Sequence, residues 1–274
     1  MSMIDSDARM IVVTGAAGGI GAAVAAALAP GARAVALWDR DPRVHEVAVE
    51  IKTRTTGSVT ATEVDITDAN AVTAAFDDLV ATHGPIDVVV HAAGALYPGS
   101  PLEIDPDAWT ECLAVNATGV VHVTQRAARE MVAAGRGAIV VISSNAAATP
   151  RVGMAAYGAA KAAATAFTRS LALQVAPLGV RVNLVSPGST DTPMLRGMFA
   201  DPAQPLAGTA RPLDAAARAA LLDGDPEVYR LGIPLRRIAA PADIAAAVRF
   251  LVSDDARHIT MHDLRVDGGA TLDM

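Results

Sequence analysis

Short runs of β-branched and other apolar residues recur along the chain, and each is followed by a longer alanine-rich or amphipathic stretch. The runs hardly alternate with polar positions, which is typical of parallel strands that are buried on both faces. The stretches between them suit helices that connect parallel strands by right-handed crossovers. We therefore predict an α/β fold, a doubly wound parallel sheet of about seven strands with helices on both faces. The expected strands are residues 10–14, 34–38, 59–64, 86–90, 138–142, 180–185 and 264–266.

One long segment, at about 189–230, breaks this alternation. Prolines interrupt its alanine-rich pieces at Pro193, Pro202, Pro205, Pro212 and Pro226. The chain shows no linker or repeat, so we predict one domain over residues 1–274, with this segment as an insertion of short helices. We expect it to cover the carboxyl edge of the sheet as a substrate lid. A plain surface excursion would show the same pattern.

The composition narrows the class of protein. Apolar residues make up 52% of the chain and aromatic residues only 3%, so small aliphatic side chains must build the core, as in an α/β enzyme. The net charge of −7 provides no basic face for nucleic acid or an anionic membrane. The single Cys112 cannot form an internal disulfide, and the first ten residues lack the features of a secretion signal. We expect a soluble, cytoplasmic protein.

Two histidines, His258 and His262, share helical spacing in the sequence HITMH. No glutamate completes a zinc motif around them, and the segment precedes a strand. We therefore expect structural histidines and no metal site.

A glycine-rich stretch, TGAAGGIG, lies between the first expected strand and a helical stretch. Glycines in this context allow a tight turn and bring backbone amides at a helix N-terminus against a pyrophosphate. Gly15, Gly19 and Gly21 are the candidates. Asp39 ends the second strand, where its carboxylate could bind both hydroxyls of an adenosine ribose and repel a 2′-phosphate. We expect a Rossmann-type site for NAD rather than NADP.

Asp65 and Ile66 follow the third expected strand. The carboxylate could accept a hydrogen bond from the adenine amino group, with the isoleucine packed on the ring. A helix N-cap is an equal alternative for Asp65.

The candidate catalytic groups are Ser144, Tyr157 and Lys161. Tyr157 and Lys161 stand at positions i and i+4 of an alanine-rich stretch, so they share one face of a predicted helix. A nearby ammonium favours the phenolate, which would make Tyr157 a general base near neutral pH. Taken alone, the same spacing also describes a chance pair on a solvated helix.

The glycine-rich loop, Asn116 in VNATG, Ser144, the YGAAK sequence and a later SPG occur in an order that resembles the short-chain dehydrogenase/reductase family over the whole chain. The resemblance implies that Ser144 hydrogen-bonds the substrate oxygen, that Tyr157 exchanges its proton and that Lys161 binds the nicotinamide ribose. It also implies that Asn116 holds a water of the proton relay. The further cofactor contacts that it implies are Ile20, Ala92, Ala93, Gly94, Pro187, Gly188, Thr190 and Thr192.

One position departs from the family pattern. The chain has His91-Ala92-Ala93-Gly94 where the family usually has NNAG. We expect His91 to be a hydrogen-bonded core histidine at the end of a strand.

Three stretches, ATPRVGMAAYGAAK, SPGSTDTPM and the C-terminal part from LGIPL onward, are similar to the 2,3-dihydro-2,3-dihydroxybenzoate dehydrogenases of this family. That resemblance implies NAD-dependent oxidation of the C3 alcohol of a cyclohexadiene carboxylate, which then aromatises to 2,3-dihydroxybenzoate for siderophores. An anionic substrate requires a cation, and Arg151 is the nearest one in sequence. A salt bridge or a solvated loop arginine is the alternative. The expected substrate contacts are Ser144, Arg151, Met154 and Tyr157, to which Met194 and Met198 could add apolar surface.

The sequence also leaves open two alternatives to a 2,3-dihydro-2,3-dihydroxybenzoate dehydrogenase. A dehydrogenase of 2,3-dihydro-3-hydroxyanthranilate would act on the same C3 alcohol, and groups near C2, such as Tyr97 or Asn145, would separate the two substrates. A non-catalytic dinucleotide sensor is expected to lose the catalytic tyrosine or lysine. Small residues along 107–134 and 156–176 allow close packing between subunits, and the family resemblance implies a homotetramer.

Overall fold

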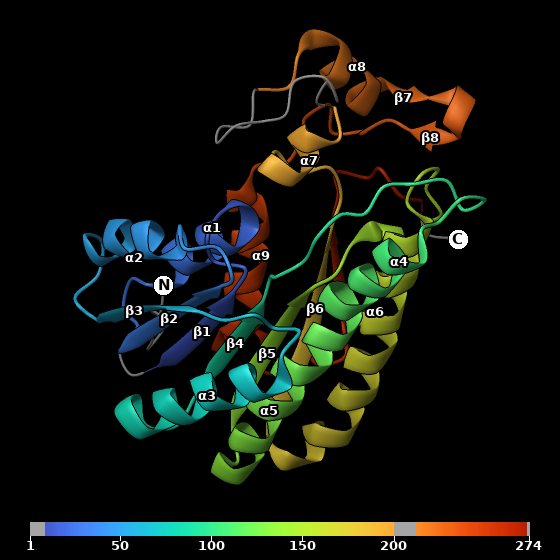
Figure 1. Ribbon diagram of the computed structural model, residues 1–274. Helices are drawn as coiled ribbons and strands as arrows, with labels where there is room; N and C mark the ends of the chain where they lie inside the picture. The colour runs from blue at the N-terminus through green and yellow to red at the C-terminus, as the bar shows by residue number, and fades with distance from the viewer. Residues whose placement is uncertain (1–8, 200–211, 273–274) are drawn as a thin grey trace.

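The computed structural model describes residues 9–199 and 212–272, which form a three-layered α/β domain (Figure 1). Its centre is a seven-stranded parallel sheet in the order β3-β2-β1-β4-β5-β6-β9. This confirms the predicted fold class and all seven expected strands, with ends that differ by a few residues. The strands are β1 (Met10–Thr14), β2 (Ala34–Asp39), β3 (Ser58–Glu63), β4 (Val88–His91), β5 (Gly137–Ile142), β6 (Val180–Pro187) and β9 (Asp263–Val266).

Helices cover both faces of the sheet (Figure 1). One face carries α1 (Gly19–Leu28), α2 (Val44–Lys52) and α9 (Pro241–Val252), and the other carries α3 (Ala69–His83), α5 (Gly119–Ala134) and α6 (Ala155–Val175). Every residue of β1 is buried, because Met10 and Val12 point into one apolar layer and Ile11 and Val13 into the other. The continuous apolar runs of the sequence therefore reflect a sheet with two buried faces.

The direction in which successive strands are added reverses at β1, which lies between β2 and β4. The loops after β1 and β4 therefore leave the sheet toward opposite faces and open a crevice at its carboxyl edge, where ligands bind in folds of this type.

The helical stretch after β4 is not uniform. It consists of α4 (Pro106–Leu113), a π-helix (Ala114–Thr118) and α5. Asp105 caps α4 by accepting a hydrogen bond from the Asp107 amide. Asn116 lies within the π-helix, a feature that often marks a functional position.

The segment after β6 forms small elements above the carboxyl edge of the sheet (Figure 1). They are α7 (Pro193–Gly197), α8 (Ala215–Asp223), the two-stranded hairpin β7 (Gly224–Asp225) and β8 (Arg230–Leu231), and the 3-10 turn Pro226–Val228 between the hairpin strands. Pro193 and Pro226 each begin a helical turn, where the missing amide hydrogen is tolerated. Residues 200–211 of the expected lid lie outside the described residues.

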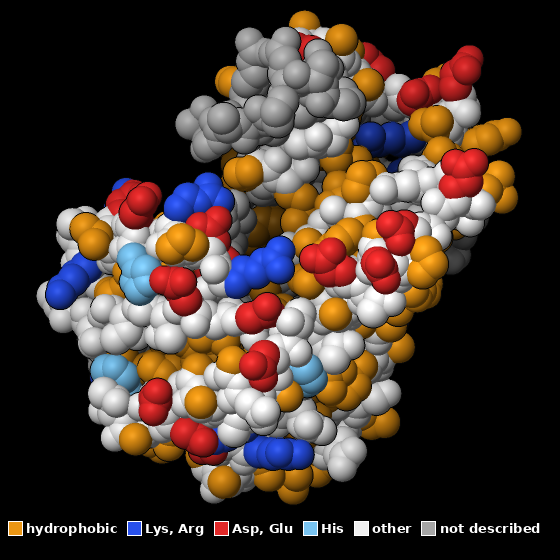
Figure 2. Space-filling view, in the orientation of Figure 1, with side chains coloured by type: hydrophobic (Ala, Val, Ile, Leu, Met, Phe, Trp, Pro, Cys, Tyr) orange, Lys and Arg blue, Asp and Glu red, His pale blue; other side chains and the backbone are white. Residues whose placement is uncertain are grey.

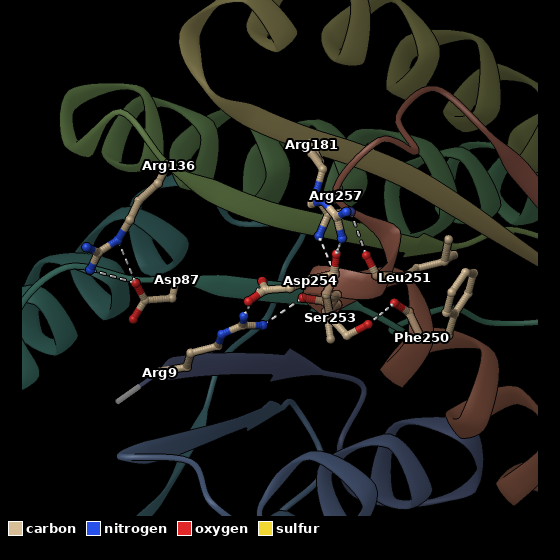
Figure 3. A network of polar contacts seen from close by, with 10 residues as sticks. Arg9, Asp87, Arg136, Arg181, Phe250, Leu251, Ser253, Asp254 and Arg257 are labelled. Atoms are coloured by element: carbon tan, nitrogen blue, oxygen red, sulfur yellow. Dashed lines mark hydrogen bonds and ion pairs between the residues drawn. The ribbon is translucent and has the colours of Figure 1, made fainter. Parts of the chain in front are cut away.

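An arginine network closes the opposite, amino edge of the sheet (Figure 3). Arg9 donates to the Val252 carbonyl at 2.7 Å and pairs with Asp254 at 2.7 Å. Arg181 donates to the carbonyls of Leu251 and Ser253. The network joins β1 and β6 to the end of α9.

The remaining short turns are the 3-10 helices Asn145–Ala147, Ala176–Leu178 and Asp254–Ala256.

Among the described residues, no helix has both the length and the apolar character that a bilayer crossing requires. Within the same residues, histidine, cysteine and acidic side chains form no group of three or more that could hold a metal ion.

Candidate active site

A cleft at the carboxyl edge of the sheet contains two adjoining cavities of about 320 and 270 Å³. Figure 2 shows a hollow between the small upper elements and the body of the domain, with hydrophobic side chains on its walls. The two cavities share lining residues, so they form one continuous cleft. The shared residues are Ile20, Ala92, Gly94, Thr192 and Met194.

The glycine-rich loop lines the first cavity, and two of its glycines have no room for a side chain. Gly15 has φ +69°, and a Cβ there would lie 2.6 Å from the Ala93 amide nitrogen. A Cβ at Gly21 would lie 2.0 Å from the Gly15 carbonyl oxygen. Helix α1 begins at Gly19, so its first amides border the cavity. Such a cradle fits the pyrophosphate of a dinucleotide.

Asp39, at the end of β2, is held by two backbone amides on the wall of this cavity. One carboxylate oxygen accepts from the Ala17 amide at 2.9 Å and the other from the Asp41 amide at 3.0 Å. Each oxygen keeps a lone pair for a further donor, such as a ribose hydroxyl. Arg43 is tied to the Asp41 carboxylate at 2.6 to 3.1 Å and holds the pKa of that carboxyl below its usual range.

Asp65 and Ile66 line the same cavity. The Asp65 carboxylate accepts from the amide and hydroxyl of Thr67 at 2.9 and 2.7 Å, and these bonds lower the pKa of its carboxyl. The alternative that Asp65 caps the next helix is wrong, because Asp68 is the N-cap of α3. Ile66 packs against Gly119, where a Cβ would lie 2.5 Å from its side chain.

His91 ends β4 beneath the loop of Ala92, Ala93 and Gly94. Its Nδ1 is hydrogen-bonded to the Thr14 hydroxyl at 3.1 Å, and its side chain is fully buried. Burial lowers the pKa of His91 to about 3, with a further contribution from the charge of Lys161. The neutral imidazole is therefore a core histidine, as the sequence predicts.

Ser144, Tyr157 and Lys161 lie together in the second cavity, although they come from the end of β5 and from α6. The Ser144 hydroxyl hydrogen-bonds Tyr157 and also accepts from the Ala146 amide at 3.1 Å. Lys161 Nζ lies 5.8 Å from the centre of the Tyr157 ring and donates to the Ile142 carbonyl at 3.0 Å. The predicted helical pair of Tyr157 and Lys161 thus forms, with Ser144, one cluster around the buried Tyr157 hydroxyl.

Burial dominates the protonation of this cluster. Burial raises the pKa of Tyr157 to about 12. The hydrogen bond from Ser144 acts in the opposite direction, but its effect is smaller. Burial also lowers the pKa of Lys161 to about 8. The expected effect of the Lys161 ammonium on the phenol is outweighed by burial of both groups, which the sequence does not reveal.

Asn116 braces the loop after β4. Its amide nitrogen donates to the carbonyls of Ala95 and Cys112 at 2.8 and 3.1 Å, and its amide oxygen accepts from the Ala95 amide at 3.2 Å. The side chain is therefore largely committed to protein partners. A Cβ at Gly94 would lie 3.1 Å from the Asn116 amide oxygen and 3.3 Å from Lys161 Nζ, so both groups border one narrow space.

The loop after β6 contributes the expected residues Pro187, Gly188, Thr190 and Thr192 to the second cavity. A Cβ at Gly188 would lie 2.5 Å from Asp267 Cβ, so only glycine fits there. Thr192 caps α7 by accepting from the Leu195 amide and lies opposite Gly19. The loop therefore bridges the glycine-rich cradle and the catalytic cluster.

The substrate end of the second cavity is apolar with two cations. Arg151 and Met154 line it as expected, together with Met194 and Met198. Sequence reasoning missed Arg230 of β8, which also lines it, because no spacing rule links a short hairpin to Ser144. Tyr97 is absent from this lining, and its hydroxyl is hydrogen-bonded to Glu111 instead.

Known proteins are similar to this chain over its whole length. The family model for short chain dehydrogenase matches residues 9–203, and one for Enoyl-(Acyl carrier protein) reductase matches residues 209–271. The chain is 39% identical to 2,3-dihydro-2,3-dihydroxybenzoate dehydrogenase of Bacillus subtilis (strain 168), with 97% of each protein covered. It is 37% identical to cis-4-hydroxycyclohexanecarboxylate dehydrogenase of Sinomonas cyclohexanicum, with 96% of each covered. A solved structure of 7α-hydroxysteroid dehydrogenase complexed with NADH and 7-oxo glycochenodeoxycholic acid has a TM-score of 0.84 at 27% identity, with 98% of this chain and 96% of that chain covered.

Proposed function

The chain belongs to the short-chain dehydrogenase/reductase family, and on that premise we propose that it oxidises the C3 hydroxyl of 2,3-dihydro-2,3-dihydroxybenzoate with NAD in siderophore biosynthesis. One observation carries the proposal. A continuous cleft joins a cradle for a dinucleotide to a pocket that holds a buried Ser144–Tyr157–Lys161 cluster and a cation, Arg151. The relatives named as 2,3-dihydro-2,3-dihydroxybenzoate dehydrogenases support the substrate.

The first cavity supports NAD as the dinucleotide. Asp39 presents a negative charge beside the expected ribose position, which opposes a 2′-phosphate. Arg43 lies near enough to attract a phosphate but is already neutralised by Asp41. The glycine-rich loop and Asp39 would hold NAD, which would supply the hydride acceptor and the positive charge of an oxidised nicotinamide.

In the proposed reaction, the C3–H bond breaks as a hydride and the C3 hydroxyl proton passes to the Tyr157 phenolate. Ser144 holds the same oxygen by a hydrogen bond. Lys161 supplies positive charge beneath the tyrosine and binds the nicotinamide ribose. The resulting ketone loses its C2 proton and gains one on oxygen, which gives the aromatic catechol. Aromatisation makes the sequence strongly favourable, so positioning is the main task of the protein.

The proton leaves Tyr157 toward solvent along the narrow space beside Gly94. We propose that Asn116 supports a water there, as the family resemblance implies. Because its amide groups are bonded to Ala95 and Cys112, the π-helix backbone at Asn116, rather than its side chain, is the better water ligand.

Three further proposals concern a substrate lid, the oligomeric state and the location of the protein. We propose that the described parts of 189–230 act as a substrate lid, which the pocket residues on α7 and β8 support. We also propose a homotetramer, because α4 and α6 expose apolar side chains such as Trp109 and Leu173, which are 36% and 65% exposed. A cytoplasmic location is supported by the buried, unpaired thiol of Cys112. Light scattering coupled to gel filtration tests the tetramer.

The decisive experiment follows NADH absorbance with NAD and two substrates, 2,3-dihydro-2,3-dihydroxybenzoate and 2,3-dihydro-3-hydroxyanthranilate. We expect kcat/KM to favour the dihydroxy acid by more than about tenfold, which corresponds to about 1.4 kcal/mol. The Tyr157→Phe variant should keep cofactor binding and lose turnover. A preference for the amino acid would identify the aminobenzoate enzyme, and no turnover of either would leave only the dehydrogenase family.

A further inference from the structure

Two guanidinium groups in the substrate cavity, those of Arg151 and Arg230, have no carboxylate partner among the described residues. The described structure contains no side-chain hydrogen bond of Arg151, and Arg230 makes one, to the Ser189 hydroxyl at 2.9 Å. Both side chains are half-buried. By contrast, Arg196 and Arg236 each form an ion pair with an aspartate, at 2.6 and 2.7 Å.

The two groups are close enough to repel each other. The charge of Arg151 lowers the pKa of Arg230, and burial lowers the pKa of both. Two half-buried like charges in one cavity are unfavourable unless an anion lies between them.

The nearest acidic groups are committed elsewhere. Asp267 affects Arg151 only by electrostatic attraction at a distance. Its carboxylate oxygens accept hydrogen bonds from the Asn145 side chain and from the Gly269 amide. Asp225 acts on Arg230 in the same way, and its side chain accepts from the Glu227 amide. Neither carboxylate forms an ion pair with Arg151 or Arg230.

The two arginines come from different parts of the fold. Arg151 belongs to the loop between Ser144 and Tyr157, which is part of the body of the domain. Arg230 begins β8, where it is paired with Asp225 of β7, and the hairpin lies above the carboxyl edge of the sheet (Figure 1). Ser189, at the end of the loop from β6, fixes the direction of the Arg230 side chain.

We propose that Arg230 is a specificity-determining residue that, together with Arg151, clamps the carboxylate of a ring substrate between the β7–β8 hairpin and the body of the domain. This inference rests on the proposed function, since it concerns the same pocket. Two guanidinium groups satisfy the four lone-pair directions of one carboxylate, and a neutral ring alcohol leaves both of them without a partner. The pocket therefore selects ring carboxylates over neutral cyclic diols.

The kinetic test compares 2,3-dihydro-2,3-dihydroxybenzoate with the carboxyl-free cyclohexadiene diol of the same configuration. We expect Arg230→Met to reduce kcat/KM for the carboxylate about 10- to 100-fold more than for the neutral diol, mostly through KM. Arg230→Lys should restore part of the selectivity, and Arg257→Met, on the opposite edge of the sheet, should change neither substrate. Equal losses on both substrates would show that Arg230 only supports the fold, and would overturn the clamp.

A binding test stands apart from turnover. We would titrate benzoate and benzamide into the NAD-bound protein by calorimetry and repeat this with Arg151→Met and Arg230→Met. We expect benzoate to bind at least about tenfold more tightly than benzamide, and each variant to remove most of that difference. If the proposed reaction is absent but this preference is found, the clamp stands for another ring carboxylate. Equal binding of the two probes by the unaltered protein refutes the clamp, even if dehydrogenation is observed.

Discussion

The ammonium of Lys161 donates a hydrogen bond of 3.0 Å to the backbone carbonyl of Ile142, the last residue of β5. The lysine side chain thus reaches from α6 to the end of the sheet, with its ammonium 5.8 Å from the centre of the Tyr157 ring. This carbonyl holds the ammonium in place, but burial still lowers the pKa of Lys161 to about 8 from its ordinary value of 10.5. Burial of the ammonium therefore outweighs the stabilisation that this one hydrogen bond provides.

The first prediction concerns stability and pH. Between pH 8 and 10.5 the unfolded lysine holds a proton that the folded one has lost, so the Lys161 contribution to the free energy of unfolding increases as pH rises. We expect Lys161→Met to remove this increase. Urea unfolding at pH 7.5 and 8.7 measures it, and Cys112, whose pKa burial raises, is present in both proteins, so only the difference between their slopes is attributed to Lys161. The same slope in both proteins would contradict a depressed Lys161 pKa.

The second prediction concerns Ser144. Its hydrogen bond lowers the pKa of Tyr157, so Ser144→Ala should shift the rise of kcat/KM with pH to higher pH. It should also reduce kcat by roughly a hundredfold, because the substrate oxygen loses a donor. Ser143→Ala is the matched control, since the Ser143 hydroxyl is bonded to Thr165 in the core. An unshifted profile in Ser144→Ala would show that Ser144 does not influence the titrating group.

The third prediction concerns the glycine-rich loop. A Cβ at Gly21 would overlap the Gly15 carbonyl oxygen, whereas a Cβ at Gly18 meets nothing within 4 Å. Gly21→Ala should therefore reduce the free energy of unfolding by about 1 to 3 kcal/mol. Gly18→Ala, whose φ of 174° is extended and open to any residue, should stay within about 0.5 kcal/mol. Equal stabilities in chemical unfolding would show that the loop shifts to make room.

The fourth prediction concerns cofactor choice. Asp39→Ala removes a carboxylate that would bind the ribose hydroxyls and repel a 2′-phosphate, so the ratio of kcat/KM for NAD to that for NADP should fall at least about tenfold. Asp41→Ala should raise NADP use to a smaller extent, because it releases Arg43 from its ion pair. The double variant should show the lowest ratio. An unchanged ratio in Asp39→Ala would place the discrimination elsewhere.

The pattern of apolar runs was enough to predict the seven parallel strands. The central runs, such as Met10–Thr14, are buried on both faces, whereas the edge strand β3 is partly exposed. Burial of a central strand acts on consecutive residues, so it leaves a continuous apolar run in the sequence. The glycine-rich loop and the i, i+4 pair of Tyr157 and Lys161 could be predicted from the sequence for the same reason. In both, the chemistry depends on residues that are neighbours along the chain.

The helix boundaries within the site were less predictable. Asp65 and Asp68 both stand before α3, and only the backbone path shows that Asp68 is the cap. The π-helix at Asn116 carries no distinctive composition that would separate it from the α-helices on either side.

The amino-acid sequence by itself determined the strands, the glycine-rich loop and the candidate catalytic groups. Tertiary structure decided their electrostatics and the substrate end of the cleft. The pKa values of Tyr157 and Lys161 depend on how much water the whole fold excludes, which is a sum over distant segments. Arg230 meets Arg151 only because a hairpin far along the chain folds back over the sheet. Long-range contacts of this kind have no periodicity in sequence, so they become visible only when the chain is folded.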